Sequence, residues 1–508
     1  VTGDSIALLG SSLQADGSTG GGQILVGGDE RGANPAVPNA RRLYADAGTQ
    51  IGADGLGTGS GGRVILYSRE FTQADARLSA RGGDEGGDGG FVETSGGYLS
   101  VGSAPDLIAP RGQSGEWLID PWNLEIVASP VPTPTTTLSA GQLIWSPVPV
   151  SPGATAYIDV NTIATALGLG ANVTIATAVL DSALVGTGNG DITLSAPLNV
   201  SIGVGPVPTL FLDAQPTGKI VLNADINFVN ASTSPGAMGL DLIAPLGVQW
   251  GNSTLTNVAV SVKQSGGASP VFGSVTVLPG VNARLLGSLS TFEANTLSMQ
   301  SGSSLTIGAG ASIDLYGVGL SPGFSAMTNL PGTSVTLGAN ATLAVGGGLF
   351  SNAGILDMGD LSSLFVGTYL SPSVTNDGQG TFTNDSGASF YLGKEQSPGI
   401  ANIASINLYA LEFFNDGALH VDFDAATFGH DFLIVYNGIN SSSGSSVFLS
   451  AGTLVPTLYG TVNGSLSFSL IQAGTFNGDF SNLSSLGLTS FVEPAPPLSQ
   501  QGGVYTVV

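Results

Sequence analysis

The sequence has no cysteine, two histidines and little positive charge. The lack of cysteine excludes disulfide bonds; it fits a bacterial surface protein that crosses a periplasm unfolded, and cytosolic proteins share it. Two histidines leave little material for acid–base chemistry. Lys and Arg together number 12 against 36 Asp and Glu, so the formal net charge is −24 at pH 7. Such a charge repels nucleic acid and anionic membranes, and we expect neither as a partner.

Long apolar runs are also missing. No stretch of 18 or more apolar residues occurs, so we expect no membrane-spanning helix. The chain does not open with a basic segment followed by an apolar one, and any signal peptide is expected to be removed or to lie outside this sequence. What the chain does have is glycine, with 77 residues, and a hydrophobic fraction of 42%. The glycines are too irregular for collagen and too mixed with Val, Ile and Leu for disorder, which predicts a use at the corners of a β-fold.

A repeated strand pattern organises the middle of the chain. Residues 274–277, 304–307 and 334–337 alternate polar and apolar side chains, as a half-buried strand does, and they begin 30 residues apart. A second strand pattern follows each of them, after Gly and Asn residues that suit a tight corner. The second strands are 283–287, 312–315 and 342–345. A repeat of strands and corners predicts one coil of a solenoid, which buries its apolar face by stacking on its neighbours.

Similar units precede and follow this region. Three strand units centred on Ala196, Ala224 and Ala244 are expected to align as successive coils of unequal length. From about residue 350 an Asn-and-Gly corner recurs, and stacked coils can line up such Asn side chains as a ladder. These corners contain Asn352, Asn376, Asn384 and Asn415. The whole pattern predicts an all-β protein with the architecture of a parallel β-helix.

The N-terminal quarter adds a specific resemblance. Three strands are each introduced by a Gly pair, which lets the backbone turn where neighbouring coils crowd it. Residues 1–127 contain GGQILVGGDERG (21–32), VPNA (37–40), GGRVILYS (61–68), GGFVETSG (89–96) and WLIDPWNL (117–124). These segments resemble the filamentous haemagglutinin family, and the resemblance extends over 159–230 and 400–508. It implies a right-handed parallel β-helix, export by the two-partner route and a place on the bacterial cell surface or outside the cell.

Four regions are expected along the chain. The Gly-rich β-helix of 1–127 is followed by a Pro-rich loop or excursion at 128–158, because proline at that density cannot donate ladder hydrogen bonds. A central β-solenoid with coils of about 20–30 residues follows at 159–400. It opens with one short helix at 161–167, capped by Asn161 and ended by Gly168. The last region, 401–508, resembles the C-terminal β-helix of bacterial passenger domains.

Two acidic groups are candidates for binding a cation. Asp84, Glu85 and Asp88 share a Gly-rich loop, a composition that binds Ca²⁺ when it is repeated, but this unit occurs once and also fits an acidic corner. His420, Asp422 and Asp424 alternate with apolar residues and fall on one face of a strand. That face could hold a metal ion or simply be solvated. Beyond a possible Ca²⁺, no cofactor is expected.

Catalysis finds little support in the sequence. A polysaccharide lyase or hydrolase is the enzyme alternative for a β-helix, and it needs convergent carboxylates, with a basic residue for a lyase. After Arg111 only Lys219, Lys263, Arg284 and Lys394 carry positive charge, and none lies beside an acidic cluster in the sequence. We therefore expect no enzyme activity.

The two ends of the sequence both carry strand patterns. Ile6 and Leu8 lie in one, and Val504, Tyr505 and Val507 in the other. An open β-helix end exposes unpaired backbone groups, so one end can pair with the other and propagate into a filament. We predict an extracellular structural subunit that stacks head to tail into a filament, sheath or biofilm matrix fibre. The alternative is a monomeric rod-like adhesin that binds surface glycans.

Overall fold

The protein is a parallel β-solenoid, as its sequence predicts. The structure is a computed structural model and is divided into two compact units, unit 1 (1–249 and 256–270) and unit 2 (250–255 and 271–508). It describes the whole chain except residues 130, 132–134, 140–141, 147–152, 178–188, 204, 232–235, 266–271, 318–323, 369–376, 394–402, 425–426, 428, 438–444, 450, 460–466, 487 and 495–502. Within the described part, no helix has the length and apolar character needed to cross a membrane.

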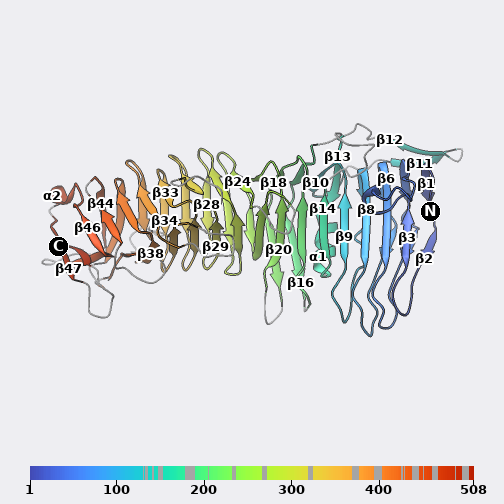
Figure 1. Cartoon of the computed structure of the whole chain (residues 1–508), viewed down its shortest axis with the longest axis horizontal. Helices are drawn as coiled ribbons and strands as arrows, with labels where there is room; N and C mark the ends of the chain where they lie inside the picture. The colour runs from blue at the N-terminus through green and yellow to red at the C-terminus, as the bar shows by residue number, and fades with distance from the viewer. Residues whose placement is uncertain are drawn as a thin grey trace. The chain divides into compact units, whose positions relative to one another are not determined.

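Unit 1 has three faces, each built from strands that stack in parallel (Figure 1). The first face holds β3 (Gln23–Val26), β6 (Arg63–Ala74), β8 (Phe91–Val101), β9 (Glu116–Asp120), β14 (Asn172–Ala176), β17 (Thr209–Asp213), β20 (Met238–Ile243) and β23 (Val258–Lys263). The second holds β1 (Ser5–Leu8), β4 (Arg42–Ala45), the ends of β6 and β8, β13 (Thr155–Asp159), β10 (Asn123–Val127), β15 (Ile192–Leu194) and β18 (Ile220–Leu222). The third holds β2 (Ser12–Gln14), β5 (Gln50–Gly52), β7 (Arg77–Ser79), α1 (Val160–Gly168), β16 (Leu198–Ile202) and β19 (Ile226–Asn230).

Unit 2 follows the same three-face plan. Its first face holds β26 (Thr291–Ala294), β29 (Ser312–Leu315), β32 (Thr342–Val345), β35 (Ser363–Val366), β38 (Ser405–Tyr409), β42 (Phe432–Tyr436) and β45 (Phe468–Ala473). The second holds β24 (Ser274–Val277), β27 (Thr296–Met299), β30 (Met327–Asn329), β33 (Leu349–Asn352), β36 (Thr381–Asn384), β39 (Glu412–Asn415), β43 (Ser446–Phe448) and β46 (Thr475–Asn477). The third holds β25 (Asn282–Leu286), β28 (Ser304–Ile307), β31 (Ser334–Leu337), β34 (Ile355–Met358), β37 (Ser389–Leu392), β40 (Ala418–Asp424) and β44 (Thr453–Tyr459).

The core lies inside each column of coils. In β28 and β31 the polar residues face outward, while Leu305 and Ile307 are fully buried and pair with Val335 and Leu337 one coil further on. The two-residue alternation therefore separates a dry interior from a hydroxyl-rich surface, as expected for half-buried strands.

The predicted 30-residue repeat is half right. The step from 304–307 to 334–337 is one coil, because β28 pairs with β31. The step from 274–277 to 304–307 is wrong: β24 pairs with β27, 22 residues on, and lies on another face than β28. The Ala units fail in the same way. Ile192 pairs with Ile220, but Leu240 belongs to the first face and pairs with Leu210 and Val260.

Residues 128–158, which were predicted to form a Pro-rich loop or excursion, contain two strands that pair with each other and a third that joins the second face. Within 128–158 the chain forms an antiparallel hairpin of β11 (Thr135–Ser139) and β12 (Gln142–Ser146), and it returns to the second face as β13. Helix α1 follows as predicted, but it begins earlier, because the carboxylate of Asp159 accepts the N–H of Asn161 at 2.9 Å and caps the helix in place of Asn161.

Unit 2 has an antiparallel cap after its last parallel strands. Strand β48 (Gly503–Val507) pairs antiparallel with β45 on one edge and with β47 (Ser490–Pro494) on the other. The short helix α2 (Leu483–Leu486) lies in the same segment, with Leu483 buried. The prediction that 504–508 forms an open strand edge is therefore wrong, since both edges of β48 are already paired.

Candidate functional site

A row of glycine pairs on the first face of unit 1 creates an open hollow. Gln23, Arg63 and Phe91 each follow a Gly pair and are brought side by side by strand pairing. A Cβ atom on Gly62 would lie 2.1 Å from the carbonyl oxygen of Gly22, and one on Gly90 equally close to that of Gly62. Only glycine fits at such a close approach of two backbones, so the predicted role of the Gly pairs is confirmed.

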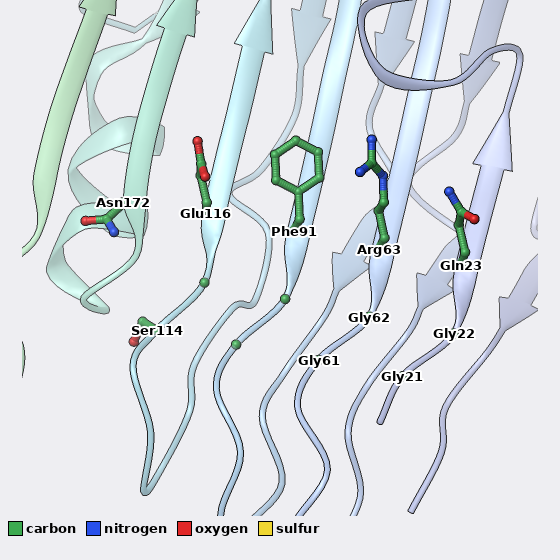
Figure 2. Close-up of a pocket in the computed structure, with 13 residues that line it drawn as sticks. Gly21, Gly22, Gln23, Gly61, Gly62, Arg63, Phe91, Ser114, Glu116 and Asn172 are labelled. Carbon is green, nitrogen blue, oxygen red and sulfur yellow. The ribbon is translucent and has the colours of Figure 1, made fainter. Parts of the chain in front are cut away.

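The glycines form the floor of an open groove with a volume of about 880 Å³, and Figure 2 shows its wall of side chains. Strand pairing continues from Phe91 to Glu116 and from Glu116 to Asn172, so one side chain per strand projects along the groove. Neighbouring strands are ~4.8 Å apart, which gives the groove a regular ladder of contacts. Its side-chain lining consists of Gln23, Arg63, Phe91, Ser114, Glu116 and Asn172.

The groove combines an aromatic ring with polar groups of both charges. The guanidinium carbon of Arg63 lies 5.0 Å from the centre of the Phe91 ring, a cation–π contact. Arg63 Nη2 also lies 2.6 Å from Glu30 Oε2, so its charge is neutralised locally. Glu116 Oε1 accepts a hydrogen bond from the Thr174 hydroxyl at 2.8 Å. The floor offers few free donors: the N–H groups of Gly62 and Gly90 donate to the carbonyl oxygens of Ala53 and Ala80 in the same coil, at 2.7 Å each. The free hydrogen-bonding groups of the groove therefore come mainly from side chains.

A segment that follows β3 borders the groove. It includes the short helix η1 (Glu30–Gly32) and lines a second hollow of about 460 Å³, which shares Gln23 and Arg63 with the groove. Gly32 of this segment lies so close to Tyr67 that a Cβ atom there would be 2.4 Å from the phenol ring. The segment therefore packs directly on the outer surface of β6.

Buried carboxylates anchor this segment. Glu93 of β8 is fully buried, and its Oε1 accepts the backbone N–H of Arg31 at 2.9 Å. The Arg31 Nε atom lies 3.6 Å from Asp120 Oδ2, whose side chain is 7% exposed. Burial raises the pKa of Glu93 to about 7 and that of Asp120 well above its ordinary value, with Arg31 opposing the rise for both. Arg31 adopts a left-handed backbone conformation with φ of 52°, which only firm contacts hold in place.

The acidic loop predicted as a Ca²⁺ candidate is exposed. Asp84, Glu85 and Asp88 all face solvent, and Asp88 Oδ1 accepts the N–H of Gln113 at 2.8 Å. Across the part of the chain that the structure describes, no three His, Asp or Glu side chains come together in a way that could hold a metal ion.

The second metal candidate lies on β40, as its alternation predicts. His420 stacks on Tyr391 of the adjacent strand, with ring centres 3.9 Å apart and planes 13° from parallel. Asp422 is 7% exposed, and Asp424 accepts a hydrogen bond from the Thr427 hydroxyl at 2.7 Å. The imidazole thus belongs to a stacked pair of rings on the outer surface.

The predicted assembly residues are buried. Ile6 and Leu8 are 5% and 8% exposed and point into the core of unit 1. Val504, Tyr505 and Val507 are 8%, 2% and 3% exposed and cover the core of unit 2. Their side chains belong to the two cores, and for Ile6 and Leu8 the predicted pairing of chain ends through backbone groups stays a prediction.

The groove itself was missed at the sequence level. The sequence does contain a signal for it, because each of three Gly pairs is followed by a strand. That pattern predicts where each strand begins, but it does not predict that the first residues of the three strands line one groove. No family model and no curated protein matches this chain.

Proposed function

We propose that this chain is an extracellular β-solenoid of a bacterial surface that binds an extended glycan in the groove of unit 1. The observation that supports this most is the ladder of Gln23, Arg63, Phe91 and Glu116 above a floor of glycines. A sugar ring has apolar C–H faces, which pack on an aromatic ring, and hydroxyl groups, which bond to amide, carboxylate and guanidinium groups. A long open groove with one such side chain per coil suits a polymer of similar units.

The charge of the chain narrows the ligand class. A formal charge of −24 disfavours nucleic acid and strongly acidic polysaccharides. Arg63 is neutralised by Glu30, so it adds no net positive charge for a polyanion. Neutral glycans fit best. Glu116 and Arg63 are each engaged by protein partners, which supports binding rather than catalysis.

Replacing Phe91 with alanine should weaken glycan binding at least tenfold, because the ring is the apolar platform of the groove. Binding is measured on an array of neutral and acidic glycans, followed by titration of the best ligand. Phe324→Ala is the matched control, since Phe324 is 63% exposed in unit 2 and far from the groove in sequence. Equal binding by both variants would contradict the proposal for this groove.

Head-to-tail assembly is a second candidate function. The strand that could mediate it is β47, whereas the sequence predicts the strands at the two chain ends. In the described part of the chain β47 pairs only with β48, and its Val492 is 51% exposed. An edge strand of this kind can pair with a strand of another molecule. Electron microscopy of the purified chain should show fibres if β47 mediates assembly, and Val492→Lys should abolish them. Isolated particles in both samples would leave glycan binding as the remaining candidate.

A further inference from the structure

One outer face of unit 2 carries a continuous row of hydroxyl groups. The second face presents one outward residue per strand at equivalent positions, because each is paired with the next across neighbouring strands. From β24 to β46 this row reads Thr276, Ser298, Thr328, Ser351, Thr383, Phe414, Phe448 and Asn477. Seven steps of ~4.8 Å make it about 34 Å long. We call this row, with the outward residues beside it, the hydroxyl strip.

The hydroxyl strip is almost free of charge. Among the described outward residues of these eight strands, Glu412 is the only charged one. The other two faces of unit 2 differ, with Glu293 and Asp314 outward on the first and Arg284 and Asp357 outward on the third. For a chain with a formal charge of −24, a face of this length with one charged residue is a distinct surface.

The strip is open to solvent and ends in aromatic rings. Ser298 and Thr328 are exposed, and they are paired with each other across the parallel strands β27 and β30. Phe414 and Phe448 are partly exposed and stack with ring centres 4.3 Å apart. Hydroxyls beside the row are linked across coils, as in the 2.9 Å hydrogen bond from Thr296 to Ser274. Two hydroxyls of the strip already donate to carboxylates, Ser351 to Asp385 and Thr381 to Glu412. The exposed Ser298 and Thr328 offer donors and acceptors on adjacent strands, and the two rings form an apolar platform.

We infer that the hydroxyl strip docks a neutral polysaccharide chain that runs along the column of coils. The single charge of the strip is the carboxylate of Glu412, so an uncharged ligand is favoured, since an anionic one would lose hydration without gaining a partner. Serine and threonine hydroxyls both donate and accept, which matches the hydroxyl groups of a sugar polymer. Phe414 and Phe448 supply the apolar contact. This surface belongs to unit 2, so it is a site in addition to the groove; it shares with the proposed function the setting outside the cell and the class of ligand, a neutral glycan.

A second copy of this chain fits the strip less well. Two chains of charge −24 repel each other at close range. Protein interfaces also need an apolar centre, and Leu349 is the only outward aliphatic side chain among the described residues of the strip. A polysaccharide brings no charge and needs hydrogen bonds more than apolar area.

The test measures retention of the full chain on microcrystalline cellulose, an uncharged polysaccharide. Soluble alginate, an acidic polysaccharide, is added as a competitor for comparison. Ser298→Glu/Thr328→Glu places two charges on the adjacent strands β27 and β30 of the strip and should reduce retention on cellulose at least tenfold. Thr291→Glu/Asn282→Glu is the matched control, because it adds the same charge at exposed positions on the other two faces. Circular dichroism and melting of all variants verify that each is folded.

Each outcome decides the inference. Retention of the wild type and the control, with loss in the strip variant, supports it. No retention of the wild type, equal retention of the strip variant, or preference for alginate overturns it. If Phe91→Ala alone loses retention, the groove is the cellulose site and the strip is not. If light scattering shows wild-type self-association that the strip variant lacks, the strip is a contact between copies.

Discussion

Replacing Asn384 with alanine is expected to lower the free energy of unfolding of unit 2 by about 3–5 kcal/mol. Asn384 is fully buried in a column of amides that runs along one corner of the coils. Its Nδ2 donates to Asn415 Oδ1 at 2.7 Å and to the Ala418 carbonyl oxygen at 3.1 Å, and its Oδ1 accepts from Asn352 at 2.8 Å. Asn329 continues the column with a 2.7 Å hydrogen bond to Asn352.

The large effect follows from what alanine leaves behind. The substitution removes one partner from each of three buried groups, and an unsatisfied buried donor or acceptor costs about 1–3 kcal/mol. Denaturant unfolding and hydrogen exchange of β36 and β39 in the full chain measure the loss. Asn407→Ala is the control, because Asn407 faces outward on β38 and its removal should cost less than about 0.5 kcal/mol. A loss below about 1 kcal/mol for Asn384→Ala would mean that the column is not a main source of stability.

The Asn corners could be predicted from the sequence because residue type and local conformation are linked. Asn352, Asn384 and Asn415 were expected to form a ladder, and their hydrogen bonds confirm it. Asn376 lies outside the described residues. Asn329 was missed, since Leu330 and Pro331 follow it, whereas Ala-Gly or an Asp followed by Ser or Gly marked the corners at Asn352, Asn384 and Asn415. The amide joins the column through the register of β30 with β33, which its own sequence does not reveal.

The face on which a strand lies could not be predicted from its pattern. All three faces alternate apolar and polar residues with the same two-residue period, so 274–277 and 304–307 look equivalent although they lie on different faces. The lengths of the turns between strands determine which face each strand joins, and in this chain these lengths change from coil to coil. The groove was missed for the same reason, because Arg63 and Phe91 become neighbours only after a 28-residue coil closes.

The free energy of unfolding of unit 1 is expected to fall as pH rises from about 4.5 to about 7. Burial raises the pKa of Glu93 to about 7 from an ordinary value of 4.5, so the folded state holds its proton more tightly than the unfolded state. A group of this kind stabilises the fold fully below its unfolded pKa and loses that contribution as pH rises through its folded pKa. At 1.36 kcal/mol per pKa unit, Glu93 accounts for about 3 kcal/mol of the fall.

Glu93→Gln should remove this part of the pH dependence. Glutamine stays neutral at every pH, and its side-chain oxygen can still accept the backbone N–H of Arg31. At pH 8 the variant should therefore be more stable than the wild type by up to about 3 kcal/mol. Burial also raises the pKa of Asp120, which therefore acts in the same direction. We expect the free energy of unfolding of the variant to fall less steeply with pH than that of the wild type.

Hydrogen exchange of β8 and β9, corrected for the intrinsic effect of pH on exchange, measures the local free energy in the full chain. Glu116→Gln on the neighbouring strand is the matched control, because Glu116 is exposed and its removal should leave the slope unchanged. A wild-type stability that is flat between pH 4.5 and 7 would mean that Arg31 compensates the charge of Glu93 completely. An increase with pH would mean that the carboxylates are stabilised in their charged form. Because Arg31 and Glu30 hold the same segment that borders the groove, the loss of stability as pH rises toward 7 should appear first in residues 27–40, before the strands beneath them open.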